Sequence, residues 1–433
     1  MLTEEIISAV SGPPIGANTA VPKDVGIYSH TLTPSWGIKS TFKKSSTPNN
    51  CMAVSNSHIF TAQDQKSHVH VYSRTRGNQE TFVSFQERIR SVALAGDVLI
   101  LGTAEGRLIL WETCTGRQII TPPCHVQAIC CLAVTSNHVL TASEDSNINV
   151  WSLARLLELG ADPGFEPDLT LSNHRSAITS LVAAPGENPE TSLCVSSSKD
   201  KTCILWNFRN GQVLRTLLFA SIPLCTTLDP CGRSLYVSCE DGSLYMVELF
   251  GGKALVGSRS AEVSSLVVQV DSPLGVADAE AGPATCLAVN YDGTLLLTGH
   301  TKGRMLRWTL ADSSHPTELA NLNASITNLT FVPLLKTDGN HKTATVVKPN
   351  PNQRQYTIQK QLGNSAQEPS RFDLLMASQG FPAEAIAKAA STVSDGEIVS
   401  NNSALADLQR ENEELKEIIK EQKELQKATL ASR

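Results

Sequence analysis

The apolar positions of this chain recur in a pattern that repeats about every 40 residues. Each copy has an apolar run, a turn, a second apolar run that ends in a small or hydroxylated residue, an acidic or glycine turn, and a short third run. Six copies align, and their third runs end at Tyr72, Trp111, Trp151, Trp206, Val247 and Trp308. These ends are 39, 40, 55, 41 and 61 residues apart. A period of about 40 to 45 residues with four short strands per copy is typical of a β-propeller.

Two of the intervals between copies are longer than the others and require insertions. Residues 155–168 and 271–283 are rich in acidic residues and in Gly and Pro, which favour turns. We expect both segments to be surface loops between blades.

Six copies do not close a circle, and the two ends of the chain supply a split seventh copy. Residues 315–334 contain two strand-like runs after the last copy, and residues 4–10 and 25–32 contain two that belong to no copy. Joining these two pairs makes a seventh blade and removes open sheet edges, at which chains aggregate. The sequence therefore predicts an all-β, seven-bladed propeller over residues 1–334, closed by N-terminal and C-terminal strands.

The composition narrows the class of protein. Apolar residues make up 41% of the chain, but no run approaches the roughly 18 apolar residues of a membrane helix. Glu4 and Glu5 stand where a signal peptide would carry basic residues. The net charge of −6 is mild, so nucleic acid would have to bind to a local basic patch. We expect a soluble protein with no membrane or secretory segment.

The 11 cysteines indicate a reducing compartment. Their number is odd, none forms a CxxC pair, and most lie in apolar strand-like runs, as Cys130, Cys131, Cys194 and Cys239 do. This spacing suits neither a disulfide framework nor a zinc site. We expect reduced core cysteines in a cytosolic or nuclear protein, without a metal, another cofactor or a small-molecule ligand.

The copies resemble WD repeats over roughly residues 1–334. In that family a His before the inner strand, a Ser or Thr on the next strand, an Asp in the following turn and a Trp on the third strand form a buried hydrogen-bonded set. The third copy offers His125, Ser143, Asp145 and Trp151. The fourth copy offers His174, Ser198, Asp200 and Trp206.

Other copies depart from this pattern. Glu105 and Lys302 replace the Asp in the second and sixth copies, and Val247 replaces the Trp in the fifth. The dipeptide that names the family is absent, because the residues that follow the tryptophans are Glu112, Ser152, Asn207 and Thr309. The assignment therefore depends on the period of the repeat.

A His, a Ser and an Asp in one blade also suit a hydrolase, in which these groups activate a nucleophile when they meet in a cleft. The recurrence of the set in successive copies favours a different explanation, since buried polar atoms need hydrogen-bond partners. The sequence also lacks a GxSxG elbow, a P-loop, an HExxH motif and a GxGxxG after a strand. We therefore expect no enzyme activity.

The features outside the repeats resemble the WD-repeat subunit of the rixosome. They are the split seventh blade, the apolar start at residues 4–10, and a C-terminal helix that contains residues 408–420. The most specific is SEDSNINVWSLARLL at residues 143–157, which continues from the Trp strand into a Leu-rich helical turn.

This resemblance implies a nuclear, non-catalytic scaffold in pre-rRNA processing and maturation of the large ribosomal subunit. The chain would bridge a helical-repeat scaffold subunit to the pre-60S particle, close to an AAA-type remodelling ATPase, during removal of the second internal transcribed spacer. Two other roles remain open: a chromatin-bound replication-licensing factor and the substrate receptor of a ubiquitin ligase. No adaptor-docking helix precedes the first copy, which disfavours the receptor. Fold alone does not tell which propeller face binds which partner.

Residues 335–402 are predicted to form a flexible, basic linker. The candidate RNA-contacting residues in it are Lys342, Lys348, Arg354 and Lys360. Such cations can neutralise RNA phosphates without reading sequence, but they equally suit a solvated linker, because Tyr356 is the one aromatic residue near them that can stack on bases. Residues 372–376 are apolar enough for a short docking helix, or they pack on the propeller itself.

Residues 403–430 have the pattern of a coiled-coil helix. Apolar and amide residues recur at alternating steps of three and four, as in a heptad seam. The candidate self-association residues are Leu405, Leu408, Asn412, Leu415 and Ile419. A lone Asn within such a seam can fix the register of a dimer. We expect a homodimer, parallel or antiparallel; the alternative is a single helix in the groove of a partner.

Overall fold

The computed structural model describes most of the repeat region and little of the C-terminal tail. The described residues are 4–12, 26–32, 35–43, 45–158, 165–184, 192–251, 254–257, 266–310, 315–333, 345–349, 410, 413, 416, 417, 419 and 420. The chain divides into two compact units, Met1–Lys360 and Gln361–Arg433.

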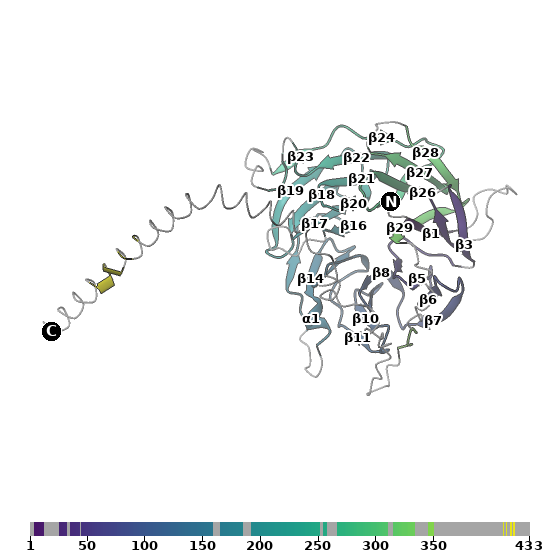
Figure 1. Cartoon of the computed structure of the whole chain (residues 1–433), viewed down its shortest axis with the longest axis horizontal. Helices are drawn as coiled ribbons and strands as arrows, with labels where there is room; N and C mark the ends of the chain where they lie inside the picture. Colours follow the sequence, from purple (N-terminus) through teal and green to yellow (C-terminus); the bar gives the residue numbers. More distant parts are fainter. Residues whose placement is uncertain are drawn as a thin grey trace, which may run out of the picture. The chain divides into compact units, whose positions relative to one another are not determined.

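The first unit is a ring of seven β-sheets, which confirms the predicted seven-bladed propeller (Figure 1). Blades 1, 2 and 3 are each made of four consecutive strands. Blade 1 has β4 (Met52–Val54), β5 (His58–Ala62), β6 (His68–Ser73) and β7 (Gln79–Ser84). Blade 2 has β8 (Ile89–Ala95), β9 (Val98–Thr103), β10 (Leu108–Glu112) and β11 (Gln118–Ile120). Blade 3 has β12 (Ile129–Val134), β13 (His138–Ser143), β14 (Ile148–Ser152) and β15 (Leu169–Leu171).

In the next three blades the first three strands are again consecutive. Blade 4 has β16 (Ile178–Ala183), β17 (Leu193–Ser198), β18 (Thr202–Asn207), β19 (Gln212–Leu218) and a fifth, parallel strand, β23 (Val267–Gln269). Blade 5 has β20 (Pro223–Leu228), β21 (Ser234–Cys239), β22 (Ser243–Glu248) and β24 (Gly275–Val276). Blade 6 has β25 (Ala284–Val289), β26 (Leu295–His300), β27 (Arg304–Thr309) and β28 (Thr317–Asn321).

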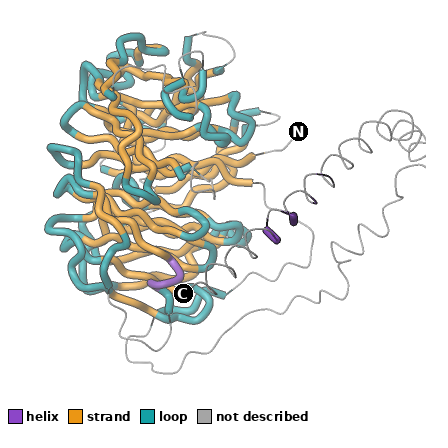
Figure 2. The backbone as a smooth tube through the Cα atoms, turned by 90° about the vertical axis from the view of Figure 1, so that its left-hand side faces the viewer, coloured by secondary structure: helices purple, strands orange, loops and turns teal. Residues whose placement is uncertain are grey.

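The core lies between neighbouring blades. Each blade packs face to face on the next, so its middle strands are buried on both sides and their sequences are nearly continuous runs of apolar and small residues. All six residues of β9, β17 and β21 are buried. The outer strands contain more partly buried and exposed positions, as β7 does. Figure 2 shows the strands running between two loop-covered faces of the ring.

Blade 7 joins the two ends of the repeat region, but not with the predicted two strands from each end. Its order is β29 (Ser325–Pro333), β1 (Glu4–Ser11), β2 (Gly26–Thr31) and β3 (Gly37–Lys43). One strand is C-terminal and three are N-terminal. β28, the other predicted C-terminal strand, pairs with β27 and completes blade 6. β3 escaped prediction because it is an outer strand with mostly polar, partly exposed residues.

The closure is held by hydrogen bonds between residues far apart in the sequence. β1 and β29 pair in antiparallel register from Glu4↔Pro333 to Ser11↔Ser325. The side-chain amide of Asn328 accepts a bond from Cys51 N at 3.1 Å and donates one to Pro48 O at 2.7 Å. These bonds connect β29 to the segment that leads into blade 1.

The buried carboxylate of Glu5 also connects blade 7 to blade 1. Its oxygens contact Arg74 at 3.0 Å and Lys39 at 3.1 Å, and Ser29 donates a hydrogen bond to it. Arg74 donates a second bond, to Pro333 O at 2.9 Å. Burial alone would raise the pKa of Glu5, but the bonds from Ser29, Arg74 and Lys39 lower it overall.

The two predicted insertions are not loops throughout. After β14 the chain forms the expected Leu-rich turn of helix, α1 (Leu153–Leu156), whose Leu156 is buried. The region around residues 271–283 supplies β24, the outer strand of blade 5, which pairs with β22. That strand has two residues, too few to give a periodic signal in the sequence.

Candidate functional site

The polar set of blade 3 links four side chains at one end of the blade. His125 Nδ1 lies 3.1 Å from Asp145 Oδ2, and its Nε2 lies 2.9 Å from Thr141 Oγ1. Trp151 Nε1 donates to the same hydroxyl at 3.2 Å. Asp145 also accepts bonds from the backbone N–H groups of Val126 and Asn147, at 3.0 and 2.9 Å. The carboxylate thus holds the turn between β13 and β14 against the loop before β12.

The hydroxyl in this set belongs to Thr141, whereas the sequence pattern suggested Ser143. Ser143 lies two residues further along β13 and donates to Gln127 O at 3.2 Å, while it accepts from Asp145 N at 3.1 Å. Residues two apart in a strand share one face. The periodicity therefore could not distinguish between Thr141 and Ser143.

Blade 4 repeats the arrangement with Ser196 in place of the predicted Ser198. His174 Nδ1 lies 3.1 Å from Asp200 Oδ2, and its Nε2 lies 2.8 Å from Ser196 Oγ. Trp206 Nε1 donates to Ser196 Oγ at 2.9 Å. Ser198 instead donates to Ser176 O at 2.9 Å.

The Ser196–His174–Asp200 distances match those of a catalytic triad, but the surroundings do not suit catalysis. Ser196 is fully buried, and its hydroxyl already binds both His174 and the indole of Trp206. A nucleophile must reach its substrate. The three groups therefore serve as hydrogen-bond partners for one another in the blade.

The ionisation states agree with a structural role. Burial lowers the pKa of His125 although the charge of Asp145 opposes this, so the imidazole is neutral. Burial would raise the pKa of Asp200, but hydrogen bonds from His174, Thr202 and the Arg175 backbone lower it overall. A neutral His125 donates from Nδ1 to Asp145 and accepts at Nε2 from Thr141, so both of its ring nitrogens have a partner.

A third, unpredicted set lies in blade 6. Trp308 Nε1 donates to Thr298 Oγ1 at 3.1 Å, and the same hydroxyl lies 2.8 Å from His300 Nε2. His300 comes from the end of β26, and its Nδ1 lies 2.7 Å from Gly282 O. Burial lowers the pKa of His300. A sequence signal for all three sets exists: the hydroxyl stands ten residues before the Trp.

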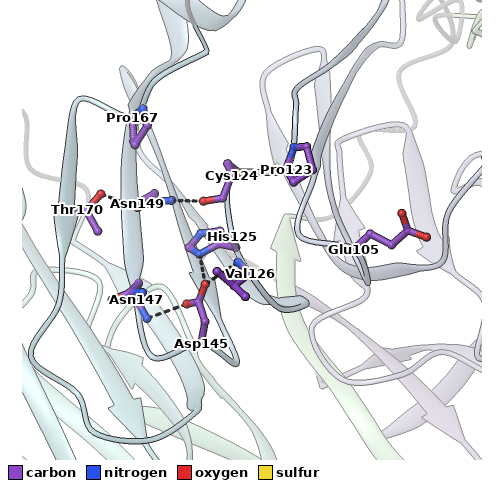
Figure 3. A pocket seen from close by; sticks show the side chains of 10 residues that line it. All are labelled: Glu105, Pro123, Cys124, His125, Val126, Asp145, Asn147, Asn149, Pro167 and Thr170. Atoms are coloured by element: carbon purple, nitrogen blue, oxygen red, sulfur yellow. Dashed lines mark hydrogen bonds and ion pairs between the residues drawn. The ribbon is translucent and has the colours of Figure 1, made fainter.

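An open pocket lies beside the blade 3 set (Figure 3). Its lining residues are Glu105, Pro123, Cys124, His125, Val126, Asp145, Asn147, Asn149, Pro167 and Thr170. Most of the polar groups already bind each other, since Asn149 donates to Cys124 O at 2.9 Å and accepts from Thr170 at 2.8 Å. Val126 is 91% exposed at its rim. The pocket is therefore better suited to contact with another molecule than to catalysis.

Comparison with known proteins agrees with this geometry. The family model "WD domain, G-beta repeat" matches residues 116–152 and 165–207, which contain the last strand of blade 2, all four strands of blade 3 and the first three strands of blade 4. These two segments of the chain therefore match WD repeats. The WD repeats also resemble a solved structure, the crystal structure of RRP9 WD40 repeats, with a TM-score of 0.53 and 18% identity over 66% of this chain and 85% of that one. That likeness concerns the fold alone.

Curated WD-repeat relatives confirm the predicted resemblance to the rixosome subunit. Pre-rRNA-processing protein IPI3 of Yarrowia lipolytica is 28% identical over 65% of this chain and 66% of its own length. WD repeat-containing protein 18 of Homo sapiens is 30% identical over 49% of this chain and 48% of its own length. The matches thus cover less than two thirds of either relative.

The predicted basic linker is described at one of its candidate RNA contacts. Lys348 belongs to a segment, Thr345–Pro349, that lies on this WD-repeat propeller, and its Nζ lies 5.5 Å from the centre of the Phe82 ring. Lys342, Arg354 and Lys360 lie outside the described residues, as do residues 372–376.

The tail after the WD repeats is described at six positions. Arg410, Glu413, Lys416, Glu417, Ile419 and Lys420 are helical and exposed. Ile419 is thus the one predicted seam residue that is described, and it is 52% exposed. Leu405, Leu408, Asn412 and Leu415 lie outside the described residues, so the coiled coil stays a prediction.

The cysteines of the WD repeats are unreactive where they are buried. All 11 are free thiols, and burial raises the pKa of Cys51 to about 12. Cys130 is only partly buried, contrary to expectation, whereas Cys131, Cys194 and Cys239 are core residues. Within the described ranges no three potential metal ligands cluster together, and no helix there is long and apolar enough to cross a membrane.

Proposed function

We propose that this chain is a non-catalytic subunit of a nuclear complex that processes pre-rRNA during maturation of the large ribosomal subunit. The observation that carries the proposal is the similarity to curated relatives named pre-rRNA-processing proteins, in Yarrowia lipolytica and in Schizosaccharomyces pombe, over more than three fifths of this chain. The finer assignment, to removal of the second internal transcribed spacer on the pre-60S particle, follows from the same resemblance.

The buried polar sets support the non-catalytic part of the proposal. Ser196, His174 and Asp200 have the distances of a triad, but their bonds are internal and the hydroxyl is covered. The same chemical groups recur in blade 3, where they hold a turn. Residues that stabilise turns in two blades are better explained as framework than as a reaction centre.

Exposed apolar side chains on the propeller support binding to protein partners. Val126, Tyr291 and Phe250 are 91, 68 and 52% exposed, and they lie on loops of different blades. Aromatic side chains such as Tyr291 and Phe250 are enriched in protein–protein interfaces relative to the rest of the surface. The partners we propose are a helical-repeat scaffold subunit, the pre-60S particle and, close by, an AAA-type remodelling ATPase.

The tail adds two proposals about assembly. Ile419 exposes an apolar side chain on a helix whose other described residues are charged, which supports a helical interface at residues 403–430, most simply a homodimer. Lys342, Arg354 and Lys360, with Lys348, supply the positive charge for contact with RNA phosphates.

The test is purification of the tagged, full-length chain from nuclei, followed by sequencing of the bound RNA. We expect precursor RNA of the large subunit that still contains the second internal transcribed spacer, and we expect this precursor to accumulate when the chain is depleted. Normal processing after complete depletion would contradict the proposal. Recovery of replication-licensing factors or of a ubiquitin ligase, without precursor RNA, would favour the alternative roles.

A further inference from the structure

The tryptophan of blade 2 lacks the polar partners that the other blade tryptophans have. In blades 3, 4 and 6 the indole N–H donates to a hydroxyl ten residues earlier in the chain. Ten residues before Trp111 stands Leu101, and Phe85 occupies the place that corresponds to His125. Leu101, Phe85 and Trp111 belong to one buried apolar cluster. This cluster offers the indole N–H of Trp111 no acceptor, and a buried donor needs one.

The acceptor comes from the chain beyond the propeller strands. Trp111 Nε1 donates to Val347 O at 3.0 Å, across 236 positions of sequence. Val347 N donates to Thr113 O at 2.8 Å. Both backbone polar groups of Val347 are therefore paired with blade 2. The neighbouring Val346 packs on the apolar cluster shared by blades 1 and 2.

Blade 2 is shaped to admit a peptide backbone at this place. Gly116 has a φ of +75°, and a Cβ there would lie 2.8 Å from Lys348 O and 2.9 Å from Val347 Cγ1. A side chain at position 116 would thus collide with the segment. On the blade 1 side, Lys348 Nζ lies 5.5 Å from the centre of the Phe82 ring, within the range of a cation–π contact.

We propose that Trp111, Thr113, Gly116 and Phe82 form a peptide-docking site, and that its occupant is the chain's own segment Thr345–Pro349. The site pairs with the backbone of Val347, partly buries the side chain of Val346, and places the cation of Lys348 over an aromatic ring. Docking anchors the polypeptide at blade 2 after its last strand has ended in blade 7, so the segments beyond Pro349 start from blade 2. This inference is independent of the proposed role in pre-rRNA processing.

The test compares two charge substitutions in the segment, made in the full-length chain. Val346→Asp places a carboxylate on the apolar cluster, whereas Thr345→Asp changes an exposed residue and is the matched control. Indole N–H signals of the five tryptophans are followed by nuclear magnetic resonance. The Trp111 signal is the one that disappears in Trp111→Phe, or the one that remains in all four other Trp→Phe variants.

We expect Val346→Asp to move the Trp111 signal alone, and Thr345→Asp to move none. Hydrogen–deuterium exchange of the Val347 amide, which donates to Thr113 O, should be at least tenfold slower than in an unstructured peptide. Val346→Asp should abolish this protection while the melting transition stays unchanged. An unmoved Trp111 signal in Val346→Asp would overturn the proposal, as would unprotected exchange of the Val347 amide in the wild type.

Discussion

At the scale of single residues, the buried tryptophans show how one hydroxyl can be the hydrogen-bond partner of both an indole and an imidazole. Ser196 accepts from the Trp206 indole and binds the His174 imidazole, which in turn contacts Asp200. Each buried polar atom of the set has a partner, so burying the set in an apolar core costs little free energy of folding. Loss of one member leaves the others unpaired.

Trp206→Ala should destabilise the propeller by about 3 to 5 kcal/mol, because it removes a large buried side chain and leaves a cavity between blades. Trp206→Phe should cost about 1 to 2 kcal/mol, since it keeps most of the apolar contact and loses the bond to Ser196. Urea unfolding of both variants measures the two values. A nearly neutral Trp206→Ala would contradict the burial of this ring.

His30 should make the stability of blade 7 sensitive to acid. It is fully buried in β2, its Nε2 lies 2.8 Å from Ser8 Oγ, and burial lowers its pKa from 6.5 to about 4, although the charge of Glu5 opposes this. Above about pH 6.5 the residue is neutral in both the folded and the unfolded chain. Between pH 6.5 and 4 only the unfolded chain binds the proton. The free energy of unfolding therefore decreases by about 3 kcal/mol in total as the pH is lowered through this range.

His30→Gln should remove this part of the pH dependence, which urea unfolding at a series of pH values from 7.5 to 4 can measure. His315→Gln changes an exposed histidine and serves as the control. Some slope should remain, because burial also lowers the pKa values of His125 and His300. An identical slope in His30→Gln and wild type would show that folding does not lower the pKa of His30.

At the scale of elements, blade 7 depends on both ends of the repeat region. β1 lies between β29 and β2, so it contributes hydrogen bonds to both neighbours. The apolar face of β1 also enters two clusters, through Ile6 on one side and Ile7 on the other. Among the strands that the structure describes, β1 alone connects the N-terminal and C-terminal parts of this sheet.

Deletion of residues 1–34 should therefore unfold the whole propeller. It removes β1 and β2, leaves β3 and β29 without their partners, and exposes two sheet edges. Calorimetry should show no cooperative transition for this variant. The matched control lacks residues 361–433, the second compact unit, and should keep the wild-type transition. An unchanged transition after the N-terminal deletion would contradict closure of the ring through β1.

At the scale of the whole molecule, we predict that residues 403–430 join two copies of the chain. About three heptads form a marginal helix in water, so stability must come from burial of the predicted seam. Ile419→Lys would place a charge in that seam, and its desolvation should exceed what so short an interface contributes. Light scattering at micromolar concentration should show a dimer for wild type and a monomer for Ile419→Lys.

Glu417→Lys is the matched control for this experiment, because it changes the charge at an exposed helical position outside the predicted seam. It should remain dimeric. A monomeric wild type would favour a helix that docks in the groove of a partner. If Ile419→Lys is still a dimer, the contact lies elsewhere, and the apolar residues 372–376 become the next candidate.

The amino-acid sequence by itself determined the number and order of the blades, because each blade is a local unit with its own apolar period and turn. It also identified His125, Asp145, His174 and Asp200, whose spacing to the following tryptophan is local. It could not choose between Thr141 and Ser143, since both lie on one face of β13. In such cases the hydrogen-bond partner in the tertiary structure determines which of the two hydroxyls joins the set.

Only the tertiary structure determined how the strands at the two ends of the repeat region are divided between blades 6 and 7. The division of blade 7 into one C-terminal and three N-terminal strands depends on β28 pairing with β27, and not on any pattern within β28 itself. The contact of Trp111 with Val347 likewise joins residues 236 positions apart. The periodicity of a sequence predicts which face of a strand is buried. It does not predict which distant strand pairs with it, because that depends on which backbone hydrogen bonds and apolar surfaces still lack a partner when the ring closes.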